Sequence, residues 1–177
     1  MLEFITTVYK QYEHLKCKKI MMGDSAGGNL VLTSCIYMSK LGFKVPSTLV
    51  CISPWVDLSS DYADVETDVL HSEILESFQS NYCTLSDTEN KLVSPLLIKD
   101  NEMDCFVGKN IMLTSGGKEV LEPQIKEMAD KLSKITNVVY DCDPEMPHIY
   151  QCLPEGFGKN STSGTERMMQ FIVEHVK

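Results

Sequence analysis

The sequence has no long hydrophobic run, no cysteine pair at metal-binding spacing and no excess of positive charge. No apolar stretch approaches the roughly 18 residues of a membrane-spanning helix. The first residues lack the charged segment followed by an apolar run that is typical of a signal peptide. The chain contains 16 basic and 25 acidic residues, for a formal net charge of −9. This charge argues against nucleic acid and against an anionic membrane surface as partners, since both attract basic proteins.

Cysteine is present, but its pattern excludes the usual cysteine-based sites. The seven cysteines are odd in number and include no C-x-x-C motif, and the histidines do not cluster with them at the spacing of zinc ligands. Several lie within apolar segments, as Cys35 and Cys51 do, so we expect buried free thiols rather than a disulfide framework. We therefore expect neither a metal nor any other cofactor.

The spacing of apolar residues predicts alternating strands and helices. The 177 residues correspond to a single domain, and a hydrophobic content of 43% is ordinary for a folded protein. Helices are expected at about 2–14, 26–40, 120–135 and 163–175, and short strands at 18–22, 48–52, 110–114 and 137–140. This alternation predicts an α/β fold, in which a mostly parallel sheet of about four strands has helices on both faces.

The sequence GDSAGG at residues 23–28 follows the first expected strand and precedes a helix. It matches G-x-S-x-G, the nucleophile elbow, in which a sharp strand-to-helix turn holds a serine in a strained backbone conformation. The flanking glycines allow neighbouring backbone to approach where a Cβ would clash. We therefore expect Ser25 to project its hydroxyl from the end of the sheet, at the positive end of the following helix.

GDSAGGNL at 23–30, together with ISPWVDLS at 52–59, resembles the hormone-sensitive-lipase-like branch of the α/β-hydrolases. Within this branch the chain is most similar to fungal esterases that include steryl acetyl hydrolases. The resemblance implies a carboxylic-ester hydrolase that acts on a small-molecule ester, either a sterol ester or a short-chain acyl ester. It also implies the endoplasmic reticulum as the compartment, whereas free cysteines favour a reducing space such as the cytoplasm.

The segment at about 59–105 departs from the alternation of strands and helices. It contains an acidic loop at 61–68, a helix expected at 69–78 and an extended element at 94–97. By resemblance to the family this insertion forms a cap or pocket wall, and an irregular surface excursion is the alternative. An apolar acyl or sterol pocket is plausible, and its candidate aromatic residues are Trp55, Tyr62, Phe78 and Tyr150. For each of them taken singly, packing in the core is the simpler interpretation.

One feature of the branch is absent. Its members carry an upstream H-G-G-G loop whose backbone N–H groups stabilise the oxyanion, and the sequence contains no such loop. Only residues 1–22 precede the elbow, so we expect the C-terminal portion of a longer hydrolase, with a partial α/β-hydrolase domain over residues 1–177. The strand at 18–22 would then be an unpaired apolar edge, and we expect self-association through it.

The resemblance and the order of the chain together predict a catalytic triad. In α/β-hydrolases the nucleophile, the acid and the histidine follow one another in that order. His148 lies in a proline-bounded loop after the last strand, as in the family, and is expected to be the base. Glu119 stands two residues before a leucine at the start of a helix, which is the family's position for the acid. Asp143 and Glu122 are the alternatives for this role.

These residues predict acyl transfer through a covalent intermediate. Ser25 attacks the ester carbonyl, His148 moves the proton and Glu119 orients the imidazole. The backbone N–H of Ala26 is expected to donate to the oxyanion, and each missing donor costs on the order of 10²–10³ in turnover. A truncated hydrolase without turnover, either a remnant or a binding module, is therefore the alternative function. A serine peptidase on the same fold is a third interpretation.

Overall fold

The computed structural model describes residues 1–153 and 158–176. One sheet is formed, in this order, by β1 (Ile20–Asp24), β2 (Thr48–Ile52), β3 (Asn110–Gly116) and β4 (Asn137–Asp143). All three pairings are parallel, and Leu49 of β2 lies level with Met21 of β1 and Ile111 of β3. Parallel neighbours need long crossover connections, and the segments between the strands provide them.

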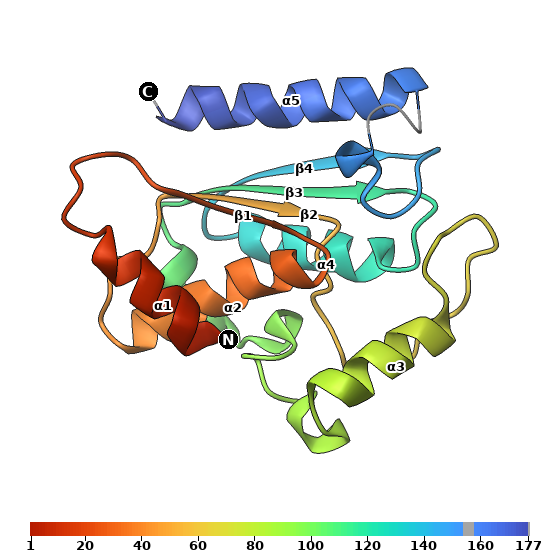
Figure 1. The fold of residues 1–177 in the computed structure, drawn as a ribbon, viewed down its shortest axis with the longest axis horizontal. Coiled ribbons are helices and arrows are strands. Elements are labelled where there is room, and N and C mark those ends of the chain that lie inside the picture. Colours follow the sequence, from red (N-terminus) through yellow and green to blue (C-terminus); the bar gives the residue numbers. More distant parts are fainter. Residues whose placement is uncertain (154–157, 177) are drawn as a thin grey trace.

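Helices cover both faces of the sheet (Figure 1). One face carries α1 (Leu2–Gln11), α2 (Ala26–Lys40) and α4 (Glu122–Ser133), and the other carries α5 (Gly158–Val176). Alternate side chains of the central strands enter two separate cores. Leu49 and Ile111 belong to the larger core, whereas Val50 and Met112 pack with Phe171 of α5. Strands β2 and β3 are thus buried on both faces, as central parallel strands require.

Most predicted elements are confirmed, and the exceptions have local causes. The helix expected at 69–78 lies further along the chain as α3 (Ser72–Tyr82), since the Asp64 carboxylate accepts the backbone N–H of Ser72 at 2.5 Å and marks its first turn. The prediction of an extended element at 94–97 is wrong. Pro95–Leu97 forms a 3₁₀ turn, closed by a hydrogen bond from the N–H of Leu97 to the carbonyl of Ser94.

Segment 59–105 connects β2 to β3 and places α3 away from the sheet (Figure 1). Leu75 is the one residue of α3 that is fully buried, and it packs into the larger core. The side-chain amide of Gln79 donates to the carbonyl of Leu58 at 2.7 Å. α3 is therefore anchored near the end of β2, where the loops of a parallel sheet form binding sites.

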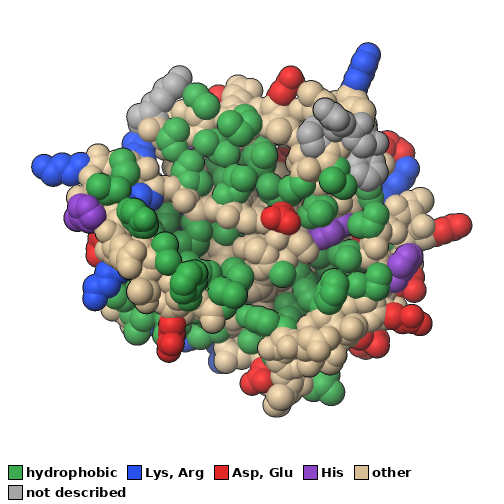
Figure 2. Space-filling model, viewed as in Figure 1, with side chains coloured by type: hydrophobic (Ala, Val, Ile, Leu, Met, Phe, Trp, Pro, Cys, Tyr) green, Lys and Arg blue, Asp and Glu red, His purple; other side chains and the backbone are tan. Residues whose placement is uncertain are grey.

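Strand β1 forms one edge of the described sheet. Met22 in this strand is 52% exposed, α1 exposes Phe4 and Val8, and Tyr12, directly after α1, is exposed as well. Figure 2 shows hydrophobic side chains gathered on this face of the molecule, where β1 and α1 lie in front. Among the described helices, none has both the length and the apolar character needed to cross a membrane.

Candidate active site

Ser25 occupies a strained turn between β1 and α2. Its backbone has φ 51° and ψ −120°, a combination that residues with a Cβ rarely adopt. Its N–H donates to the carbonyl of Ile52 at 2.8 Å, and its own carbonyl accepts from the N–H of Trp55 at 3.1 Å. Glycine is required beside it, because a Cβ on Gly23 would lie 2.4 Å from the carbonyl oxygen of Gly27. The turn is thus held by β2 and the segment that follows it, and it places the hydroxyl at the carboxyl end of the strands.

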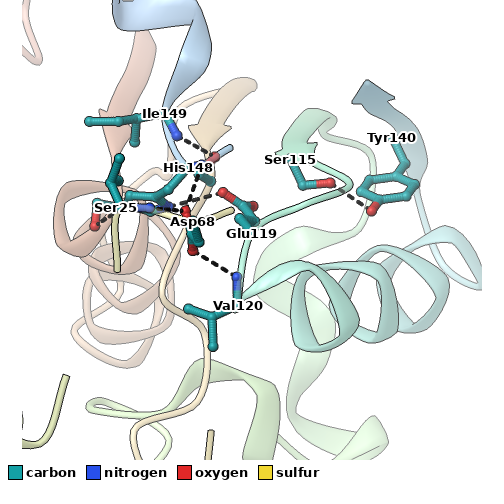
Figure 3. Close-up of polar contacts among 10 residues, drawn as sticks. Ser25, Asp68, Ser115, Glu119, Val120, Tyr140, His148 and Ile149 are labelled. Atoms are coloured by element: carbon teal, nitrogen blue, oxygen red, sulfur yellow. Dashed lines mark hydrogen bonds and ion pairs between the residues drawn. The ribbon is translucent and has the colours of Figure 1, made fainter. Parts of the chain in front are cut away.

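His148 connects Ser25 to Glu119 (Figure 3). His148 Nε2 lies 2.9 Å from Ser25 Oγ, and His148 Nδ1 lies 3.0 Å from Glu119 Oε2. The tautomer that satisfies both contacts carries its proton on Nδ1, so Nδ1 donates to the carboxylate and Nε2 accepts from the hydroxyl. The three residues follow β1, β3 and β4, and they meet because the strands are parallel and their carboxyl ends share one edge.

The loops that carry Glu119 and His148 are pressed together by backbone contacts. The N–H of Gly117 donates to the carbonyl of Asp143 at 2.7 Å, and the N–H of Lys118 donates to the carbonyl of Met146 at 3.0 Å. A Cβ on Gly116 would lie 2.1 Å from the Met146 carbonyl oxygen. The Gly-Gly sequence before Glu119 therefore permits the close approach that brings the carboxylate and the imidazole into hydrogen-bond distance.

The alternative acids lie elsewhere. Glu122 is in the first turn of α4, where its Oε1 accepts the hydroxyl of Tyr140 at 2.8 Å. Asp143 ends β4, and its carboxylate accepts the N–H of Glu145 at 3.1 Å. Of the three carboxylates considered, Glu119 is the one that the structure brings to His148.

Glu119 and His148 are both enclosed, with exposed fractions of 2% and 3%. Burial raises the pKa of the Glu119 carboxyl above its ordinary range, and the hydrogen bond from His148 opposes this elevation. The charge of Asp68 raises the same pKa further. A buried carboxylate against Nδ1 fixes the tautomer of the imidazole and stabilises the imidazolium that proton transfer would create.

An apolar cavity of about 200 Å³ opens beside Ser25. Its wall combines the beginning of α2, the segment that follows β2, and α3 with the residues just before it: Ala26, Asn29, Leu30, Trp55, Leu58, Leu70, Leu75, Phe78 and Tyr82. Two of the aromatic candidates, Trp55 and Phe78, thus line it. Tyr62 instead lines a neighbouring cavity of about 680 Å³, which shares Trp55, Leu58 and Leu75 with the first, and Tyr150 is fully buried in the fold. Core packing, the simpler interpretation from the sequence, thus holds for Tyr150, and Tyr62 also packs against the core.

A family model described as steryl acetyl hydrolase matches residues 1–149. The chain belongs to this family. An acetyl-hydrolase of Streptomyces hygroscopicus is 28% identical over 146 residues, which cover 77% of this chain and 47% of the relative. Steryl acetyl hydrolase 1 of Saccharomyces cerevisiae is 31% identical over 133 residues, covering 66% of this chain and 31% of the relative. The match to a model that spans most of the chain confirms the predicted family.

Solved structures share the fold of this steryl acetyl hydrolase family member. A hormone-sensitive-lipase homologue from a metagenome library superposes with a TM-score of 0.86 at 23% identity, over 99% of this chain and 62% of its own. An esterase of the bacterial hormone-sensitive lipase family gives 0.85 at 21% identity, over 99% and 60%. The α/β-hydrolase fold is thus confirmed, and the chain spans less than half of the curated relatives above and about 60% of these neighbours.

Two residues at the site were missed by sequence reasoning. Asp68 accepts the N–H of His148 at 3.1 Å and the N–H of Val120 at 2.8 Å (Figure 3). Ser53 Oγ accepts the N–H of Ile149 at 3.1 Å. Asp68 stands in a stretch of acidic residues that is typical of a solvated loop. Ser53 belongs to the ISPWVDLS segment that carries the family resemblance. The sequence therefore indicated that this segment matters, but it did not indicate what Ser53 does.

Proposed function

We propose that Ser25, His148 and Glu119 form the catalytic triad of a serine carboxylic-ester hydrolase. The observation that carries the proposal is the continuous hydrogen-bond chain from a strained serine to a buried carboxylate, at the mouth of an apolar cavity. A serine hydroxyl is a weak nucleophile by itself, and an imidazole within hydrogen-bond distance activates it.

In the first half of the proposed reaction Ser25 Oγ attacks the ester carbonyl carbon while His148 Nε2 takes the hydroxyl proton. The carbonyl oxygen becomes an oxyanion, and the backbone N–H of Ala26 is the proposed donor to it, since the first N–H groups of α2 have no acceptor within the helix. Collapse of this intermediate expels the alcohol, which takes the proton from His148. Glu119 holds the imidazole throughout.

In the second half a water molecule attacks the acyl-serine carbonyl. His148 now takes a proton from the water and returns it to Ser25 Oγ as the carboxylic acid leaves. Each half therefore uses the imidazole first as a base and then as an acid. These steps use the side chains of Ser25, His148 and Glu119, the backbone N–H of Ala26 and one water molecule.

The proposed substrate is an ester with an apolar component, of the sterol or short-chain acyl class. The wall of the 200 Å³ cavity is dominated by leucine and aromatic side chains, with Asn29 among its few polar members. Such a lining favours a hydrocarbon group through burial of apolar surface, at about 25 cal/mol per Å². We propose that α3 and the rest of segment 59–105 act as the pocket wall, because Leu70, Leu75 and Phe78 come from it.

The experiment that tests this function is hydrolysis of 4-nitrophenyl acetate by the purified chain. We expect turnover that Ser25→Ala abolishes and that Ser80→Ala leaves unchanged, since Ser80 lies on α3 and bonds only its own helix. Turnover that survives Ser25→Ala would contradict the assignment of the nucleophile. Repeating the assay with butyrate and longer acyl esters then gives the acyl preference.

A binding role without turnover is the second candidate. It is favoured by the absence of an H-G-G-G sequence, which leaves Ala26 as the one oxyanion donor that we can propose from these residues. A fluorophosphonate separates the two functions, because it reacts with an activated serine whether or not deacylation follows. Binding of an apolar ester without labelling of Ser25 would support the binding role.

We also propose that two copies of the chain associate through β1, antiparallel about a twofold axis. The proposal is supported by the open backbone edge of β1 and by the exposed Met22 and Tyr12 beside it. We expect the wild-type chain to elute as a dimer and Met22→Lys as a monomer in size-exclusion chromatography. A wild-type chain that stays monomeric at all concentrations would contradict this pairing.

A further inference from the structure

Asp68 is a buried carboxylate that lies between the two loops of the candidate triad, although it comes from a third segment. It is 6% exposed and belongs to the irregular chain before α3. In Figure 3 it lies between His148 and Val120. Burying a carboxylate is costly unless it is well hydrogen-bonded, so the hydrogen bonds that Asp68 accepts there must offset this cost.

Both oxygens of Asp68 are used by backbone N–H groups. Oδ1 accepts from His148 at 3.1 Å and from Val69 at 2.8 Å, and Oδ2 accepts from Val120 at 2.8 Å. Two of these donors belong to the triad loops: one is the backbone of the base itself, and the other follows Glu119 directly. One rigid carboxylate thus fixes the distance between the backbones of the acid and the base.

The other links between these loops lie towards their strand ends. They join Gly117 to Asp143 and Lys118 to Met146, before Glu119 and His148 are reached. Asp68 closes the far side of the pair, where the side chains turn towards Ser25. Ser53 also contacts this side, through the N–H of Ile149 and the carboxyl of Glu119. Without Asp68, the two loops would lose the one carboxylate that binds both of their backbones, and the 3.0 Å contact between His148 Nδ1 and Glu119 Oε2 would be less constrained.

The charge of Asp68 does not by itself favour the site, because it faces a second buried carboxylate and raises the pKa of Glu119. The hydrogen-bond geometry accounts for its presence instead. A carboxylate accepts at both oxygens, whereas an amide has one acceptor oxygen and an NH₂ group that only donates. An asparagine would therefore place its NH₂ group opposite a backbone N–H from which Asp68 now accepts a hydrogen bond, and two donors cannot bond each other.

We propose that Asp68 is a positioning residue for ester hydrolysis, which holds the backbones of Glu119 and His148 at the separation that the triad requires. This inference rests on the proposed function. It also links segment 59–105 to the chemistry, because the chain that supplies Leu70 to the cavity wall is anchored to the triad two residues earlier.

The test compares Asp68→Asn with Asp57→Asn in the full chain. Asp57 is a matched control, since it is also a 6% exposed aspartate that accepts local hydrogen bonds, from Ser59 and Ser60, without touching the triad loops. We expect Asp68→Asn to lower kcat for 4-nitrophenyl acetate about 10²-fold with KM close to wild type, the loss typical of a misplacement of about 1 Å. Asp57→Asn should keep the wild-type kcat.

Two further readouts separate positioning from a general loss of structure. In a Glu119→Gln background, Asp68→Asn should add little to the loss of kcat, because both changes act on the same imidazole. The downfield proton resonance of the His148–Glu119 hydrogen bond should shift or vanish in Asp68→Asn and persist in Asp57→Asn.

An unchanged kcat and resonance in Asp68→Asn would overturn the inference, as would a kcat loss that is fully additive with Glu119→Gln. A wild-type chain with no Ser25-dependent turnover would instead count against the proposed function. In that case the resonance alone decides whether Asp68 holds the two loops.

Discussion

Replacing Glu119 by glutamine should lower activity and raise stability at neutral pH. The carboxyl is 2% exposed, and burial is the main cause of its elevated pKa. In the unfolded chain its pKa is about 4.3. At pH values between this unfolded pKa and the higher pKa of the folded state, the folded state binds more protons than the unfolded state. The free energy of unfolding therefore falls as pH rises through this range. Each unit of pKa elevation corresponds to about 1.4 kcal/mol lost above the folded pKa.

Glutamine keeps the shape of the side chain and removes this cost. The difference in unfolding free energy between Glu119→Gln and wild type should therefore grow from pH 4 upwards and level off above the folded pKa of Glu119. Urea unfolding of both proteins at matched pH values measures it, and the contributions of titrating groups that do not interact with Glu119 cancel in the difference. Turnover should fall on the order of 10⁴-fold, because an amide favours the wrong tautomer of His148.

A difference that is independent of pH would refute this reasoning. So would the opposite trend, in which wild type gains stability over Glu119→Gln as pH rises. Either result would mean that the surroundings favour the ionised carboxylate in the folded state, and that His148 more than compensates for its burial.

Two substitutions test the loops and the cavity. Gly116→Ala should destabilise the fold by about 1–3 kcal/mol and lower kcat, because its Cβ would lie 2.1 Å from the Met146 carbonyl oxygen. The matched control in urea unfolding is Gly27→Ala, whose Cβ would meet nothing within 4 Å. This control should be neutral or stabilising. Equal stability of the two variants would contradict the close approach of the loops. Phe78→Ala should raise the preference for butyrate over acetate esters by up to about tenfold, since it removes one wall of the cavity, and an unchanged preference would exclude Phe78 from the acyl subsite.

Much of the fold was predictable because its signals are local. Periodic apolar residues located the strands and helices, and the glycine-flanked Ser25 indicated the elbow before any contact was known. The strand ends carry the expected loops, so Glu119 and His148 come together once the sheet is parallel. The choice among three carboxylates was harder, since Glu122 differs from Glu119 by less than one helical turn. In the structure the contact between His148 Nδ1 and Glu119 decides it, whereas Glu122 accepts the hydroxyl of Tyr140.

Other parts depend on contacts that local patterns do not encode. Asp68 reaches residues that are 52 and 80 positions away in the sequence, and in a run of acidic residues it resembles any solvated carboxylate. Tyr62 is aromatic, as pocket residues often are. Its hydroxyl nevertheless accepts the indole N–H of Trp55 at 3.1 Å, and the residue lies outside the cavity beside Ser25. Tertiary hydrogen bonds decide both positions.

The most direct test of the account is covalent labelling of the chain with a fluorophosphonate, followed by peptide mapping. We expect one adduct, on Ser25, which forms in wild type and is lost in His148→Ala while the fold is retained. Labelling that is absent from wild type, or that persists on Ser25 without His148, would contradict the claim that the hydrogen-bond chain from Glu119 through His148 activates this serine.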